Sequence, residues 1–333
     1  MRVLLLGGGA HAHSHLRAYD QLRAAGHDVE VVGIVDPDAG RGSSLAARWG
    51  AAWHRDVSTV DPASIDAADL CTPTASHPQL GAACAQRRWP TLIEKPLAAT
   101  LAGADDIIEA FTRTGTALTA GHSTRFVPAV AALAREARSG AIGSPVLVSV
   151  AQEQGYAWPG GWRAWQLDEA ASGGRIVHLA IHDIDVACWL MGSRAELVRA
   201  VGSRGRGGPG APWASVAIQI SFTDRLALIT ASWEAQPASR WRKRCLVVGS
   251  TGELRLDTAD DEAVDPPSDL DPAGYQASIE IQLAAWLASV RDGTESPVPL
   301  DEARQSLAVA EAAQRSAVAD GAVVDVREVL DGR

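Results

Sequence analysis

The sequence predicts an α/β protein in two parts: a doubly wound parallel sheet, then an α+β domain with a large, mostly antiparallel, open sheet. Short apolar runs alternate with helix-like stretches over the first part, and longer strands with alternating polarity follow. The length of 333 residues suits two domains. We predict a first domain at 1–122 and a second at 123–333, with the C-terminal helices packing back on the first.

The first domain is predicted from apolar runs that end at glycine or polar residues. Runs of this kind are typical of buried strands, and their alternation with helices implies a parallel sheet covered on both faces. The expected strands are 3–6, 29–35, 68–71, 91–93 and 116–120, and the expected helices are 11–25, 77–88 and 100–114.

The second domain is predicted from alternating strands joined by short turns at 223–224 and 249–252. We expect strands at 146–151, 196–201, 214–222, 226–234 and 244–248, helices at 175–191, 275–291 and 301–320, and loops at 205–212 and 257–272.

Composition and charge exclude several classes of protein. The formal net charge of −10 argues against a nucleic-acid binder, which needs a basic surface. The four cysteines form no CxxC pair, so neither a disulfide framework nor a zinc site is predicted. No apolar run is long enough for a signal peptide or a membrane span. We expect a cytoplasmic protein with no membrane partner.

Lysine is unusually rare in this chain. Of 30 lysine and arginine residues, only Lys95 and Lys243 are lysine. The scarcity of lysine makes Lys95 a candidate functional residue. Lys243 lies among Arg240, Arg242 and Arg244, and we expect it on the surface.

A glycine-rich run follows the first predicted strand and opens the first helix. Gly7, Gly9 and Ala12 fit G-x-G-x-x-A, in which the residues allow a tight turn, close approach of a pyrophosphate and close helix packing. Ala10 and His11 lie within this run, at the helix N-terminus that would face the phosphates. The run predicts a dinucleotide site.

Asp36 ends the second predicted strand, where a carboxylate would bind the adenosine ribose and repel a 2′-phosphate. NAD is therefore the predicted cofactor, with NADP as the alternative because Arg41 lies nearby. His11, His13 and His15 do not predict a metal site, because residues two apart do not share a helix face.

Four further motifs occur in a fixed order along the chain. They are Cys71–His77, Glu94-Lys95-Pro96, the run 121–129, and Gly173-Gly174-Arg175 leading into His182-Asp183-Ile184-Asp185. Together they resemble the Gfo/Idh/MocA oxidoreductase family over nearly the whole chain. The resemblance implies a Rossmann domain, and an NAD(P)-dependent enzyme acting on CH–OH groups.

The resemblance also implies roles for residues near the predicted nicotinamide end of the site. Lys95 would polarise the reacting oxygen, and Pro96 would follow a cis peptide bond. Thr72, Pro73, His77 and Glu94 would contact the cofactor together with Lys95.

The family's second motif maps a proton-exchanging histidine to His182 and an acid to Asp185, which would orient His182 or bind a substrate hydroxyl. The family's usual aspartate four residues before this histidine is His178 here. We treat His178 as an atypical catalytic helper, although its spacing of four from His182 also admits a metal pair without a third ligand.

Other side chains are weaker candidates. Arg125 corresponds to an arginine near the substrate in the family, with a structural ion pair as the alternative. Trp158, Trp162 and Trp165 are mostly expected in the core or an interface, with at least one, taken as Trp162, facing the pocket. Gln152 and Trp233 would lie on strands beneath the pocket.

The predicted function is hydride transfer between NAD(P) and a sugar, cyclitol, related polyol or ketone. Two alternatives are an NAD-retaining glycosidase that acts by transient oxidation and elimination, and a non-catalytic cofactor sensor. The resemblance further implies a homodimer or homotetramer formed through the second sheet.

Overall fold

The computed structural model describes residues 1–155, 163–208, 210–235, 242–258 and 274–332. The chain forms two compact units. The first comprises Met1–Ala98, Ala102–Phe126 and Gln276–Leu300, and the second comprises Ala99–Leu101, Val127–Tyr275 and Asp301–Arg333. Among the described residues, no helix is long and apolar enough to cross a membrane.

The first unit contains a parallel sheet of six strands in the order β3-β2-β1-β4-β5-β6. Its central strands are mostly apolar and buried, as expected for a sheet covered on both faces, with Asp69 of β4 as a buried exception. The strands are β1 (Arg2–Leu6), β2 (Glu30–Val35), β3 (Ala52–His54), β4 (Ala67–Leu70), β5 (Thr91–Glu94) and β6 (Leu118–Gly121).

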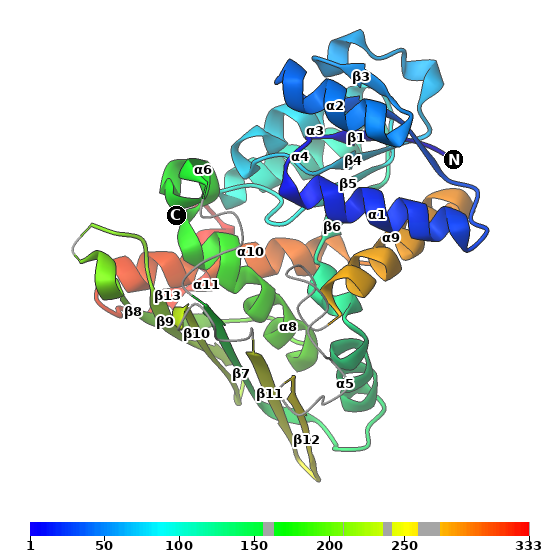
Figure 1. Cartoon of the computed structure of the whole chain (residues 1–333). Helices are drawn as coiled ribbons and strands as arrows, with labels where there is room; N and C mark the ends of the chain where they lie inside the picture. Colours follow the sequence, from blue (N-terminus) through cyan, green and yellow to red (C-terminus); the bar gives the residue numbers. More distant parts are fainter. Residues whose placement is uncertain (156–162, 209, 236–241, 259–273, 333) are drawn as a thin grey trace. The chain divides into compact units, whose positions relative to one another are not determined.

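The strand order reverses between β1 and β4, so right-handed crossovers place the connecting helices on opposite faces of the sheet (Figure 1). A ligand site is expected at this switch point, beyond the carboxyl ends of the strands. The helices are α1 (Ala10–Ala24), α2 (Ala39–Trp49), α3 (His77–Gln86), α4 (Leu101–Thr114) and α9 (Tyr275–Asp292).

The second unit contains a sheet of seven strands in the order β12-β11-β7-β10-β9-β8-β13. Only β7 and β10 pair in parallel, and every other neighbouring pair is antiparallel. The strands are β7 (Pro145–Gly155), β8 (Leu197–Ser203), β9 (Ser215–Phe222), β10 (Arg225–Ala235), β11 (Arg242–Gly249), β12 (Glu253–Asp257) and β13 (Val324–Asp325). This arrangement confirms the predicted fold class.

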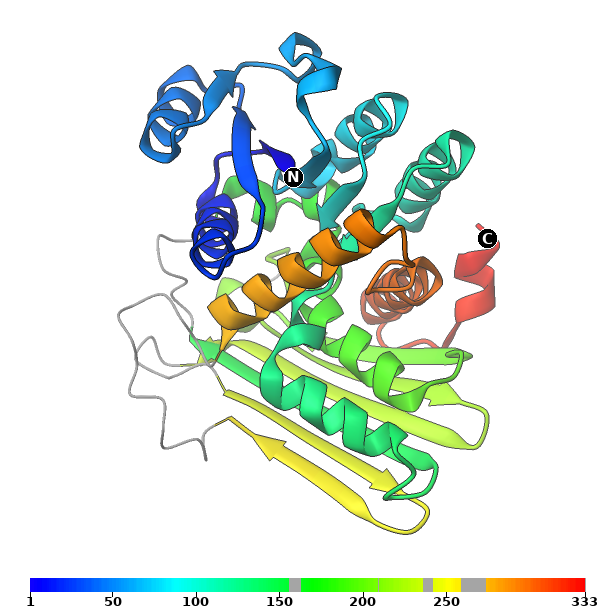
Figure 2. The same ribbon diagram turned by 90° about the vertical axis from the view of Figure 1, so that its right-hand side faces the viewer.

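Helices of the second unit pack on one face of its sheet, with α5 and α8 lying along the strands (Figure 2). Alternate residues of β8 and β9 are buried against this layer and exposed on the other side. The helices are α5 (Pro128–Arg138), α6 (Ala164–Leu167), α7 (Glu169–Ser172), a π-helical segment (Ile176–Ala180), α8 (Ile181–Met191), α10 (Leu300–Val318) and α11 (Val326–Leu330).

Short 3₁₀ turns complete both units, at Val57–Thr59, Pro62–Ser64, Thr74–Ser76, Ser123–Phe126 and Gly205–Gly207. Several regular elements of the described residues were not predicted, namely α2, β3, α5, α6, α7, β12 and α11. In α2, glycines at 40 and 42 weaken the helical pattern, and the helix is begun by the Asp38 side chain accepting from the Arg41 N–H at 3.0 Å. The predicted loop at 257–272 is wrong at its start, because Asp257 ends β12, and residues 259–272 lie outside the described part.

Candidate functional site

The glycine-rich turn after β1 lies at the switch point of the first sheet. Gly7 has φ +100°, and a Cβ there would lie 2.8 Å from the Cys71 carbonyl oxygen, so glycine is required. A Cβ at Gly9 would meet nothing within 4 Å. The turn therefore packs tightly against the Cys71 backbone at Gly7, whereas the space beside Gly9 is open.

The first turn of α1 is suited to an anion. Its N-cap, Gly9, has no side chain to accept from the helix N–H groups, so these donors and the positive end of the helix dipole are available to a phosphate. Ala10 is exposed on this turn, and Ala12 is fully buried, as close packing on the sheet requires. The chain thus fits a bound pyrophosphate, as the motif predicts.

Asp36 lies beside this turn and is already held by several donors. Its carboxylate accepts from the Gly8 N–H at 2.8 Å, the Asp38 N–H at 2.9 Å and the Arg41 guanidinium at 2.7 and 2.9 Å. Burial alone would raise the pKa of Asp36, but these donors together lower it. An ionised carboxylate, paired with the Arg41 guanidinium, therefore lies at the end of β2.

His77 ties together the loops after β4 and β5. Its Nδ1 lies 3.0 Å from the Pro96 oxygen, and its Nε2 lies 3.0 Å from the Thr72 oxygen. Burial lowers the pKa of His77, against the effect of these carbonyls. His77 was predicted to contact the cofactor. The structure places its ring between backbone carbonyls, while Thr72 is half-buried and Pro73 is exposed.

Glu94 ends β5 and Lys95 follows it at the same edge of the sheet, and the Lys95–Pro96 peptide is cis, as the family resemblance suggests. Glu94 Oε2 accepts from the Lys95 backbone N–H at 3.2 Å. Burial lowers the pKa of Lys95 to about 8, while the Glu94 carboxylate acts in the opposite direction. An ammonium whose pKa is near neutrality can both stabilise negative charge and release a proton.

Two histidines of α1 contact Glu94. His11 Nε2 lies 3.2 Å from Glu94 Oε2, and His15 Nε2 lies 3.4 Å from Glu94 Oε1. His15 and its second partner, Asp69, were not predicted, because the alternation of His11, His13 and His15 hides the spacing of four between the first and the last. The spacing of four between His11 and His15 places both on one face of the helix.

The second unit carries the other predicted catalytic residues. His178 lies in the π-helical segment and is buried, with its Nε2 3.4 Å from Gln166 Nε2 and its ring 5.1 Å from that of Trp165, edge on. His182 lies in the first turn of α8 and is half-buried. The helix predicted over 175–191 is therefore not uniform, and the π turn changes the spacing between the two histidines.

Two predicted substrate-binding residues are buried. Asp185 is fully buried and accepts from the Ser306 hydroxyl of α10 at 2.8 Å. Arg125 is also buried, in the 3₁₀ turn after β6. Trp162 and Trp158 lie outside the described residues.

Lys243 is not on the surface, so that prediction is wrong. Its Nζ lies 2.7 Å from Asp183 Oδ1, with 2% and 0% of the two side chains exposed. With its amide oriented to donate, Gln152 of β7 lies 3.2 and 3.3 Å from the Asp183 oxygens. Burial raises the pKa of Asp183 even beside this lysine. The buried ion pair of Lys243 and Asp183 fixes the start of α8 next to His182. Trp233 of β10 is also buried.

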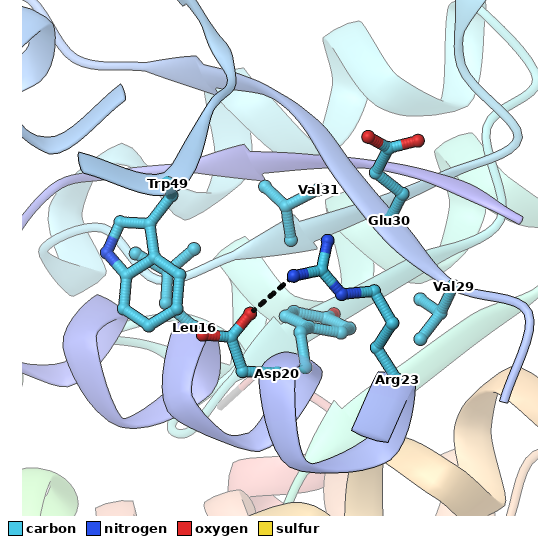
Figure 3. Close-up of a pocket in the computed structure, with 8 residues that line it drawn as sticks. Leu16, Asp20, Arg23, Val29, Glu30, Val31 and Trp49 are labelled. Carbon is cyan, nitrogen blue, oxygen red and sulfur yellow. Dashed lines mark ion pairs between the residues drawn. The ribbon is translucent and has the colours of Figure 1, made fainter. Parts of the chain in front are cut away.

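A shallow pocket elsewhere in the first unit is unrelated to these residues (Figure 3). It lies between α1 and the start of β2, and is lined by Leu16, Asp20, Arg23, Val29, Glu30, Val31 and Trp49, among others. Asp20 and Arg23 form an exposed ion pair of 3.6 Å within it. The pocket lies at the amino end of β2, whereas Gly7 and Asp36 follow the carboxyl ends of their strands.

Comparison with known proteins gives matches over most of the chain. Residues 1–122 match the sequence profile described as the oxidoreductase family with an NAD-binding Rossmann fold, and residues 130–255 match the GFO/IDH/MocA C-terminal domain.

Individual relatives align over nearly their whole length. Inositol 2-dehydrogenase 1 of Saccharopolyspora erythraea is 28% identical over 98% of this chain and 96% of its own. A probable dehydrogenase from Thermotoga maritima has a TM-score of 0.86 at 24% identity, covering 99% of this chain and 100% of its own. Levoglucosan dehydrogenase, solved with NADH and levoglucosan, has a TM-score of 0.84 at 22% identity, covering 98% and 99% of the two chains. The solved structures share the fold of this chain.

Proposed function

The chain belongs to the Gfo/Idh/MocA family of NAD-dependent oxidoreductases, and we propose that it transfers a hydride between NAD and a carbinol carbon of a sugar, cyclitol or related polyol, or the matching ketone. The observation that carries this proposal is Lys95, whose pKa is lowered to about 8 at the edge of the sheet that holds the dinucleotide turn. The inositol 2-dehydrogenase relative, aligned over 98% of this chain, supports a polyhydroxylated substrate.

In the proposed reaction, residues of this chain bind the cofactor and accept or return the proton of the substrate hydroxyl. The N–H groups at the start of α1 hold the pyrophosphate, Asp36 accepts from the adenosine ribose, and bound NAD supplies the hydride acceptor. Lys95 polarises the reacting oxygen, and His182 exchanges the hydroxyl proton. His178 stands where the family has an aspartate, so it supports His182 without a fixed negative charge.

The proposed function is tested with a panel of inositols, sugars and nitrophenyl glycosides, with NAD and NADP supplied separately. We expect reduced cofactor to accumulate, measured by its absorbance, with at least one polyol or sugar. Release of nitrophenol without added cofactor would indicate the glycosidase instead. Cofactor binding with no turnover on any substrate would favour a sensor.

Cofactor preference gives a second prediction, tested with the variant Asp36→Asn. The amide keeps an oxygen for the Gly8 N–H but loses the charge that repels a 2′-phosphate, and Arg41 loses its carboxylate partner. We expect the ratio of kcat/KM for NAD to that for NADP to fall by about tenfold or more, because a charge-assisted hydrogen bond contributes roughly 1.5–3 kcal/mol. An unchanged ratio would remove Asp36 from ribose recognition.

We also propose that the exposed face of the second sheet pairs with a second copy of the chain, giving a homodimer or homotetramer. Its outward side chains include Leu197, Val201 and Leu228, each at least 38% exposed, on strands β8 and β10, which flank β9 in the sheet. Apolar side chains on an exposed sheet face favour association.

A further inference from the structure

A line of buried polar side chains runs through the first unit, next to the glycine-rich turn after β1. His15 Nδ1 lies 2.7 Å from Asp69 Oδ2, and the Tyr19 hydroxyl donates to the same oxygen at 2.8 Å. On its other side, His15 Nε2 faces Glu94 Oε1 at 3.4 Å. The line therefore joins α1, β4 and β5, and ends at the residue preceding Lys95.

Two carboxylates along this line lie on either side of one imidazole. Asp69 and His15 are fully buried and Glu94 is nearly so, and isolated carboxylates at such depth would be costly. Burial by itself would lower the pKa of His15, but Asp69 and its other polar neighbours raise it well above the ordinary value. A protonated His15 donates from Nδ1 to Asp69 and turns its Nε2 toward Glu94 Oε1 at 3.4 Å, as an ion pair rather than a formed hydrogen bond.

The surrounding backbone leaves Glu94 little freedom. Glu94 is paired in the sheet with Gly121 of β6, where a Cβ would lie 2.7 Å from Glu94 Oε1. Its other oxygen faces His11 and the Lys95 backbone N–H, both at 3.2 Å. Because both oxygens of the Glu94 carboxylate are held in this way, the Glu94–Lys95 peptide is fixed in position.

We propose that His15 is a positioning residue for Lys95: it joins the carboxylates of Asp69 and Glu94 in the interior and so fixes the Glu94–Lys95 peptide. This inference rests on the proposed role of Lys95 in turnover. It predicts that His15 acts on the reaction through Glu94, without touching substrate.

A double-mutant cycle tests this dependence. His15→Gln, Glu94→Gln and the double variant are compared with wild type in kcat, in the Kd of NAD and in the unfolding free energy of the cofactor-free protein. We expect each single change to lower kcat by about 10–100-fold, as misplaced catalytic groups do, with the Kd of NAD changed by less than about threefold. The double variant should be within about twofold of the slower single variant, since both changes break the same contact.

The neighbouring His13 gives a matched control. It lies on the same helix but is exposed, so His13→Gln should retain wild-type kcat and stability. If His15→Gln does not fold, Tyr19→Phe removes one neutral donor from Asp69 and should lower kcat in the same direction by a smaller factor.

Several outcomes would overturn the proposal. Losses in kcat that multiply in the double variant would show that His15 acts independently of Glu94, and unchanged kcat in His15→Gln would remove it altogether. Donor atoms of His11, His15 and Glu94 lie within 4.8 Å of one another, so a stoichiometric metal lost in His15→Gln would make His15 a ligand instead. Failure of the role of Lys95 itself is distinguishable, because the coupling in unfolding free energy would persist.

Discussion

Lys95→Ala is expected to lower kcat by about 10²–10⁴-fold while the Kd of NAD changes by less than about threefold, the range typical of losing a general acid or an oxyanion donor. Lys95 lies beyond the carboxyl end of β5, whereas the proposed pyrophosphate site is at the start of α1. Steady-state kinetics and a fluorescence titration of NAD measure the two quantities separately.

The same variant has a signature in the pH profile. Burial lowers the pKa of Lys95 to about 8, so its ammonium form, and the rate that depends on it, is lost as the pH rises through about 8. This alkaline limb of kcat/KM should be absent from the residual activity of Lys95→Ala. If the alkaline limb persists unchanged in Lys95→Ala, it reports the titration of a group other than Lys95.

Lys95→Arg is the matched control for charge. It keeps the positive charge but replaces a compact ammonium by a planar guanidinium, which requires more room beside Glu94 and the cis peptide. We expect it to recover less than about one tenth of wild-type kcat. Near-wild-type turnover in Lys95→Ala would remove Lys95 from the mechanism.

The fold was largely predictable because each unit has its own periodicity. Buried apolar runs alternating with helices predicted the parallel sheet, and period-two alternation predicted the antiparallel one. The elements that were missed, such as α2 and β3, have weak patterns: α2 contains two glycines, and β3 is three residues long. Their formation depends on contacts with β2 rather than on local preference.

The candidate site was predictable only where a motif carries a backbone requirement. Gly7 is fixed by its positive φ and Glu94-Lys95-Pro96 by its position after β5, so both were identifiable. The buried partner Asp69 was not, because a carboxylate within a predicted apolar strand has no local signal for what it binds. Its contact with His15 spans 54 positions in the sequence.

Lys243 shows how local composition can mislead. Its arginine neighbours suggested a solvated segment, yet the alternation of β11 places Lys243 on the same face as the buried Cys245 and Val247. Arg242 and Arg244 point to the other side, where they form partly exposed ion pairs with Asp257 and Glu153. The period of the strand was the signal that would have corrected the prediction.

Lys243→Met should therefore destabilise the protein by about 3–5 kcal/mol at neutral pH, because it leaves the Asp183 carboxylate buried without its cation. Arg244→Met is the matched control. It removes an ion pair of the same length, 2.7 Å, from the next residue of the strand, but that pair is about half exposed and should contribute less than about 1 kcal/mol. Urea denaturation of both variants measures the difference.

The deficit of Lys243→Met should also depend on pH. Asp183 already has a raised pKa in the folded protein, so the folded state gains stability when this carboxyl is protonated and loses it as the pH rises. Removing the lysine raises that pKa further, so the destabilisation should be smaller near about pH 4 than at about pH 7.

The double variant Lys243→Met with Asp183→Leu should recover much of the lost unfolding free energy, since an apolar pair of similar volume needs no cation. Equal deficits for Lys243→Met and Arg244→Met would show that the buried pair has no special weight in anchoring α8 and, with it, His182.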